Sequence, residues 1–151
     1  LQCARQADET GAAPTLVAAA LLHDIGHFAV EFPSDMKNAK DTGHDKVGAA
    51  ILEPFFGPEI VEPIRLHVRA KRYLCTVEPS YYDKLTLPAQ HTFRLQGGKM
   101  SAVEIEEFKA LPFAEGATRL RRWCDLGMTP GRKTKRFKEY YSLINSVLKE
   151  E

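Results

Sequence analysis

The feature that most constrains this chain is a His-Asp pair at the end of an apolar run. The segment 16–22 contains only small and aliphatic residues, and His23 and Asp24 follow it directly. Burying an imidazole and a carboxylate costs free energy unless a partner compensates their polarity. A divalent metal ion does so, because imidazole nitrogen and carboxylate oxygen are ligands common to zinc, iron and manganese sites. The pair therefore predicts a metal centre at the end of a core helix, with His27 on the same helical face as His23.

The rest of the chain has the pattern of helices separated by short turns. Apolar residues recur at helical spacing, prolines stand at candidate helix starts, and Ser101 with Glu104 has the spacing of a capping box. We find no internal repeat and no convincing hairpin. The sequence predicts an all-α fold with helices over residues 1–7, 14–26, 43–53, 58–77, 85–95, 101–110, 114–126 and 136–149. A loop is expected over 28–41, and Asp41-Thr42 is the expected cap of the helix after it.

Composition limits the class of protein. A chain of 151 residues that is 44% hydrophobic can build one domain with a real core. The formal net charge of +1 gives no electrostatic argument for nucleic acid or a membrane surface as a partner. Cys3, Cys75 and Cys124 are an odd number of cysteines without CxxC spacing, which is typical of reduced thiols and predicts a cytoplasmic protein.

Further candidate site residues lie on the helices downstream. His44 and His67 stand in apolar helices, where a lone histidine usually packs in the core, but the His-Asp pair makes both candidate metal ligands. Asp125, at a helix end, is either a solvated carboxylate or another ligand. Lys71, one turn after His67, is either an exposed lysine or a cation that receives an anionic substrate group. Arg122 has the same two interpretations, and its guanidinium could hold an anion with two hydrogen bonds.

Several of these segments resemble a known family. Residues 20–27, Ala-Leu-Leu-His-Asp-Ile-Gly-His, resemble the signature of the HD superfamily of metal-dependent helical proteins. Residues 67–75 (His-Val-Arg-Ala-Lys-Arg-Tyr-Leu-Cys), 95–98 (Leu-Gln-Gly-Gly) and 120–125 (Leu-Arg-Arg-Trp-Cys-Asp) resemble the phosphonate-catabolism HD-domain oxygenases, which are related to myo-inositol oxygenase. The resemblance covers nearly the whole chain and implies a single HD-domain helical bundle over residues 1–151.

The resemblance also implies a chemistry. Members of this family hold a mixed-valence pair of iron ions (Fe²⁺/Fe³⁺) and use O₂ to cleave the C–P bond of a small 1-hydroxyphosphonate. The implied substrate is 2-amino-1-hydroxyethylphosphonate, which gives glycine and phosphate, or its trimethylammonium analogue, which gives glycine betaine. The alternative is an HD phosphohydrolase that uses Mn, Co or Zn to cleave a nucleotide or another phosphate ester. A third possibility is a non-catalytic HD module that senses a metal or ligand.

Carried over by position, the resemblance assigns roles to individual residues. The implied metal ligands are His23, Asp24, His44, His67 and Asp125, and Asp24 is the bridging ligand. The implied substrate contacts are His27, Lys71 and Arg122, with Lys71 also acting in catalysis. The family's first histidine ligand is expected about two residues ahead of Leu1, so the printed chain would lack it. The family tends to have serine before Gln-Gly-Gly, where residues 86–89 here are Thr-Leu-Pro-Ala.

Overall fold

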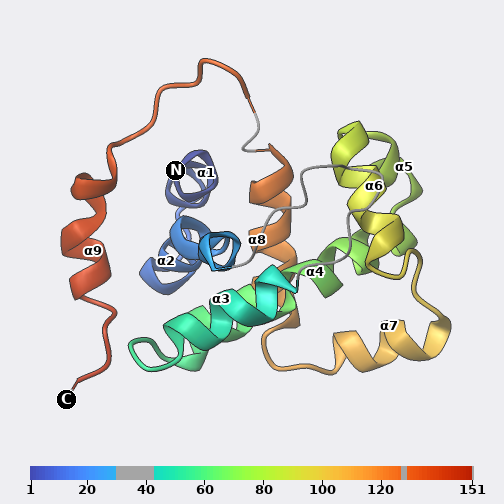
Figure 1. The fold of residues 1–151 in the computed structure, drawn as a ribbon, viewed down its shortest axis with the longest axis horizontal. Coiled ribbons are helices and arrows are strands. Elements are labelled where there is room, and N and C mark those ends of the chain that lie inside the picture. Colours follow the sequence, from blue (N-terminus) through green and yellow to red (C-terminus); the bar gives the residue numbers. More distant parts are fainter. Residues whose placement is uncertain (30–42, 127–128, 151) are drawn as a thin grey trace.

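The structure is a set of packed helices, as the sequence predicts. The computed structural model describes residues 1–29, 43–126 and 129–150, and the regular elements in these ranges are all helical (Figure 1). The β-type pairing described there is a single isolated bridge between Phe56 and Leu148. The all-α prediction is therefore confirmed. None of the described helices is both long and apolar enough to cross a membrane.

One long helix organises the core. Helix α4 runs through the middle of the fold and packs against α2, α3 and α8, while α1 packs against α2 and α8 (Figure 1). Proline at the first position favours the start of α4, where its missing N–H is not needed. The bounds of these helices are α1 Gln2–Glu9, α2 Pro14–Leu22, α3 His44–Leu52, α4 Pro58–Val77 and α8 Ala114–Leu126. The predicted range 58–77 is confirmed.

Three shorter helices form the opposite side of the fold from the C-terminal segment. These are α5 Pro79–Asp83, α6 Leu87–Leu95 and α7 Ala102–Lys109 (Figure 1). The capping box that begins α7 is formed as expected, because Ser101 and Glu104 exchange side-chain to backbone hydrogen bonds. Helix α5 was not predicted, since its five residues are too few to show a periodic pattern.

The C-terminal segment is less helical than the sequence suggests. The helix expected over 136–149 is present only as the 3₁₀ turn η3 Phe137–Tyr140 and the short helix α9 Tyr141–Asn145. Tyr140 is buried against the core, and the chain turns after α9 before the Lys149 N–H donates to the Phe55 carbonyl at 2.9 Å. The loop expected over 28–41 lies outside the described residues from 30 onward, as does the Asp41-Thr42 cap.

The helix expected over 14–26 also ends early, and this changes how the His-Asp pair is held. Helix α2 stops at Leu22, His23 and Asp24 form a turn, and the 3₁₀ helix η1 Ile25–Phe28 follows. Close contact with α3 accounts for the change of direction. A Cβ atom at Gly26 would collide with the His44 carbonyl oxygen and would stand 2.7 Å from the Gly48 nitrogen. Only glycine allows the two backbones to approach this closely.

We expect Gly26→Ala to destabilise the fold by at least about 2 kcal/mol, because the added methyl group must push η1 and α3 apart. Chemical denaturation followed by circular dichroism measures this free energy of unfolding. Gly57→Ala is the matched control, since its Cβ would meet only the mobile carboxylate of Glu59, at 2.6 Å, and the expected cost stays within about 1 kcal/mol. Equal costs for the two variants would contradict the close-contact explanation.

Candidate metal centre

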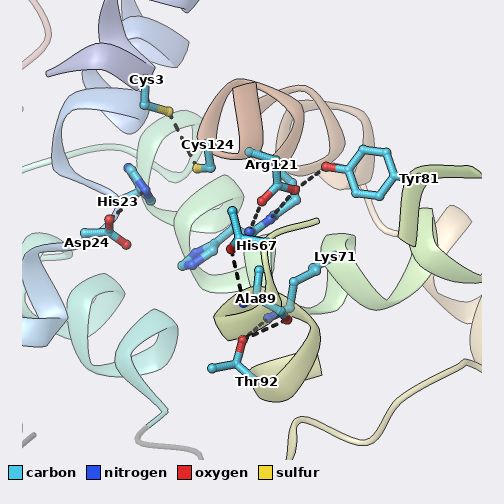
Figure 2. Close-up of polar contacts among 12 residues, drawn as sticks. Cys3, His23, Asp24, His67, Lys71, Tyr81, Ala89, Thr92, Arg121 and Cys124 are labelled. Carbon is cyan, nitrogen blue, oxygen red and sulfur yellow. Dashed lines mark hydrogen bonds and ion pairs between the residues drawn. The ribbon is translucent and has the colours of Figure 1, made fainter. Parts of the chain in front are cut away.

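Four histidines and one aspartate converge from four elements. His23 and Asp24 form the turn after α2, and His27 lies in η1. His44 begins α3, and His67 lies in the middle of α4. The Nε2 atoms of His44 and His67 are 3.0 Å apart, and the His27 and His44 rings stack with centroids 4.0 Å apart. Figure 2 shows His23 and Asp24 beside His67. The structure thus brings together residues that lie up to 44 positions apart in the chain.

Backbone carbonyls fix which nitrogen of two rings faces the centre. His67 Nδ1 lies 2.7 Å from the carbonyl oxygen of Ile64, and His23 Nδ1 lies 2.9 Å from that of Ala20. A carbonyl can only accept a hydrogen bond, so each Nδ1 carries a proton and donates it. The Nε2 atom of each ring is then the one turned toward the centre, which is the usual arrangement of metal-binding histidines.

The charges within the cluster depend on one another. Burial, together with the neighbouring charges of His23 and His44, holds the pKa of His67 well below its usual range, so this ring is neutral. Partial desolvation opposes ionisation of Asp24, whose side chain is still 59% exposed, but the His23 hydrogen bond and the nearby imidazoles hold its pKa below the usual range. Burial also lowers the pKa of His23, yet the adjoining Cys124 sulfur and Asp24 carboxylate raise it to about 10. A metal ion that binds His23 must therefore displace a proton.

The arrangement of donor atoms suits a divalent cation. Asp24, His27 and His44 each offer a ligand atom, and these three atoms lie within 4.8 Å of one another. In an octahedral site with metal–nitrogen distances of about 2.1 Å, two neighbouring ligands stand about 3.0 Å apart, which matches the Nε2 atoms of His44 and His67. Nitrogen and carboxylate oxygen together favour iron, zinc, manganese or cobalt over the alkaline-earth ions. The cluster is thus a candidate metal centre.

Asp125 lies nearby but is held by other partners. Its carboxylate accepts hydrogen bonds from the Tyr81 hydroxyl and from both arms of the Arg121 guanidinium, with Arg121 Nε 3.0 Å from Oδ2. Burial and the Asp125 charge raise the pKa of Tyr81 well above its usual range, so the hydroxyl stays protonated and donates. Asp125, His23 and Asp24 line the same cavity. The carboxylate is therefore fixed at the wall of the candidate centre.

A cavity of about 720 Å³ opens beside the cluster. Its lining includes Thr92 of α6, and the Thr92 hydroxyl accepts a hydrogen bond from Lys71 Nζ at 2.9 Å (Figure 2). Of the two interpretations of Lys71, the exposed lysine is wrong, because only 3% of the residue's surface is exposed. A buried ammonium group is costly unless it has partners, and the Thr92 hydroxyl is one of them. The position of Lys71 one helical turn beyond His67 makes it a candidate binding residue.

The two adjacent arginines of α8 differ in position. Arg122 forms an ion pair with Glu78 and lies over the Tyr81 ring, and it is not among the described residues that line the cavity. Arg121 does line the cavity and pairs with Asp125. Sequence reasoning missed Arg121, although its place four residues before Asp125 on a helix is the spacing of an ion pair. Nothing in the sequence pattern marks Tyr81 or Thr92.

We expect Arg121→Lys and Tyr81→Phe each to weaken metal binding about 10-fold, because they loosen the Asp125 carboxylate without removing it. Competition with a chelator of known affinity measures the change. The matched controls are Arg119→Lys, whose guanidinium lies over the Trp123 ring, and Tyr82→Phe, whose hydroxyl contacts Arg94. Unchanged metal affinity in both test variants would mean that Asp125 does not depend on these contacts.

Comparison with known proteins identifies the family of this chain. The HD domain family matches residues 1–101. A hydroxymethylphosphonate dioxygenase of Gimesia maris is 43% identical over 98% of this chain and 75% of its own length. A glycine-betaine-forming [1-hydroxy-2-(trimethylamino)ethyl]phosphonate dioxygenase of Leisingera caerulea is 43% identical over 74% of this chain, and that match spans 58% of the relative.

A third relative has a lower sequence identity to this chain. An uncharacterized protein of Acanthamoeba polyphaga mimivirus is 31% identical over 99% of this chain and 69% of its own length. The family match covers the His-Asp pair together with His27, His44, His67 and Lys71. With the helical fold and the converging histidines, these matches show that the chain belongs to the HD-domain family and is a relative of the phosphonate dioxygenases.

Proposed function

We propose that the centre holds two iron ions and that its ligands are His23, Asp24, His44, His67 and Asp125, with Asp24 as the bridge. The fixed Nε2 atoms of His23 and His67 and the 3.0 Å approach of His44 to His67 support this set. When bound, the iron ions would supply the activation of O₂ and the storage of electrons. The free cysteines support a cytoplasmic location.

We propose that the protein cleaves the C–P bond of a small 1-hydroxyphosphonate, such as 2-amino-1-hydroxyethylphosphonate. One O₂ is consumed for each phosphonate, and the products are a carboxylic acid, glycine in this example, and phosphate. The C–P bond breaks, the carbon is oxidised, and O₂ is reduced, so no other oxidant is required. The dioxygenase names of the two relatives at 43% identity support this reaction over phosphate-ester hydrolysis.

In this proposal the chain's own residues bind and orient the substrate. Lys71 Nζ, held against Thr92, would receive the phosphonate oxygens, since a buried ammonium group attracts a dianion strongly. His27, stacked on His44, would contact the substrate beside Asp24. Arg122 would contact the substrate only by exchanging Glu78 for it. The helix that carries Asp125 packs along α4, which supports one HD domain that extends past residue 101 to the end of the chain.

The single observation that carries the proposal is the buried Lys71 cation next to a cluster of metal-binding type. The test is phosphate release from 2-amino-1-hydroxyethylphosphonate and from hydroxymethylphosphonate by the iron-loaded protein, with and without O₂. Release that requires O₂ is the expected result. Equal release from a phosphate ester without O₂, supported by manganese or cobalt, would replace the oxygenase with a hydrolase.

A further inference from the structure

Two cysteines meet beside the candidate metal centre. Cys3 of α1 and Cys124 of α8 come from opposite ends of the chain, and their sulfur atoms lie 3.6 Å apart (Figure 2). Both are free thiols. His23 completes a group of three, in which one ligand atom of each residue lies within 4.8 Å of the others. The proposed function uses neither cysteine.

The separation of the two sulfur atoms matches shared metal coordination. A disulfide requires a distance of about 2.05 Å, far shorter than the distance observed. Two thiolates bound to one tetrahedral zinc ion, each at about 2.3 Å, stand roughly 3.8 Å apart. Two sulfur donors and one imidazole form a softer ligand set than the carboxylate and histidines of the adjoining centre, and soft ligands favour zinc and its heavier analogue cadmium.

A metal ion can reach this group through the cavity already described. Cys3, Cys124 and His23 all line the cavity of about 720 Å³, although Cys3 itself is only 6% exposed. Three protein ligands leave one position of a tetrahedral ion open toward the cavity, where a water molecule completes the coordination. The group therefore has the ligands, the spacing and the access that a zinc ion needs.

We propose that Cys3, Cys124 and His23 form a second metal site, selective for zinc over iron, and that it competes with the His/Asp centre for His23. The competition rests on the proposed function, which makes His23 an iron ligand. Because His23 Nδ1 donates to the Ala20 carbonyl, Nε2 is the only nitrogen that either metal can bind. The arriving cation replaces the two thiol protons and the proton on His23 Nε2, all three protons pass to solvent, and no group changes its oxidation state.

The first test titrates metal-free protein with Cd²⁺ and follows the ultraviolet thiolate-to-cadmium charge-transfer absorption. The expected result is saturation of this absorption at one Cd²⁺ per chain, lost in Cys3→Ser and in Cys124→Ser, with at least about 100-fold weaker binding in each. Cys75→Ser is the matched control, since Cys75 is a buried thiol outside the group. An absent absorption, or one lost only in Cys75→Ser, overturns the proposal.

The second test repeats the cadmium titration on protein already loaded with iron. Because both sites need His23, bound iron is expected to raise the Cd²⁺ concentration that half-saturates the absorption, and the absorption is expected to grow in step with the release of iron. A titration that bound iron does not change, with the iron retained, overturns the competition. Because the cadmium absorption needs neither O₂ nor phosphonate, failure of the oxygenase assay leaves this test intact.

Discussion

Replacing Asp24 by alanine is expected to remove bound metal and to lower phosphate release by at least about 100-fold, more than the loss of an outer-shell contact. Asp24 is the only residue that contacts both His23 and His27 as an ion-pair partner in the described structure, at 3.0 and 3.8 Å. Without its charge, the His23 and His27 imidazoles lose the carboxylate that pairs with them and would help to balance a divalent cation. Elemental analysis of the purified variant, together with the phosphate assay, measures both losses.

The Asp24→Ala variant tests metal binding without disturbing the fold, because the Asp24 side chain is 59% exposed and its removal leaves no cavity in the core. We therefore expect the variant to unfold at close to the temperature of metal-free wild-type protein. Asp83→Ala, which removes an exposed carboxylate at the end of α5, is the matched control and is expected to keep full metal content and activity. Full metal occupancy in the Asp24 variant would refute its role as a ligand.

The elements that the sequence predicted well are those whose signals are local. Proline at the first position and apolar residues at helical spacing define α4 from Pro58 to Val77, and the Ser101/Glu104 box begins α7. The His-Asp pair is recognisable because polar residues directly after an apolar run need compensation. These features depend on neighbours within one or two turns, so they can be read without knowledge of the fold.

The features that escaped prediction depend on contacts between distant segments. Helix α2 stops at Leu22 because Gly26 meets the backbone of α3, and the 14–26 pattern contains no sign of that contact. The C-terminal segment leaves its helix after Asn145, beyond which Lys149 pairs with Phe55. Arg121 rather than Arg122 lines the cavity, a difference of one position that rotates a helical side chain by about 100°.

Replacing Lys71 by methionine is expected to raise KM for the phosphonate about 100-fold, because the variant loses a charged contact to a dianion in a largely buried place. Methionine has nearly the length of lysine and fills the same space. A cation that binds substrate and transition state equally changes KM with little change in kcat. Steady-state kinetics of phosphate release measure KM and kcat separately.

The melting temperature of the Lys71→Met variant is a second measurement, and stability is not expected to fall with substrate binding. Burying an ammonium group opposes folding, so methionine is expected to leave the melting temperature unchanged or to raise it, even as substrate binding weakens. Lys46→Met on the exposed side of α3 is the matched control, with unchanged KM. A lower melting temperature with unchanged KM would show that Lys71 and its Thr92 contact serve the fold. Weaker binding in a variant at least as stable as the wild type identifies Lys71 as a residue kept for the substrate at the expense of stability.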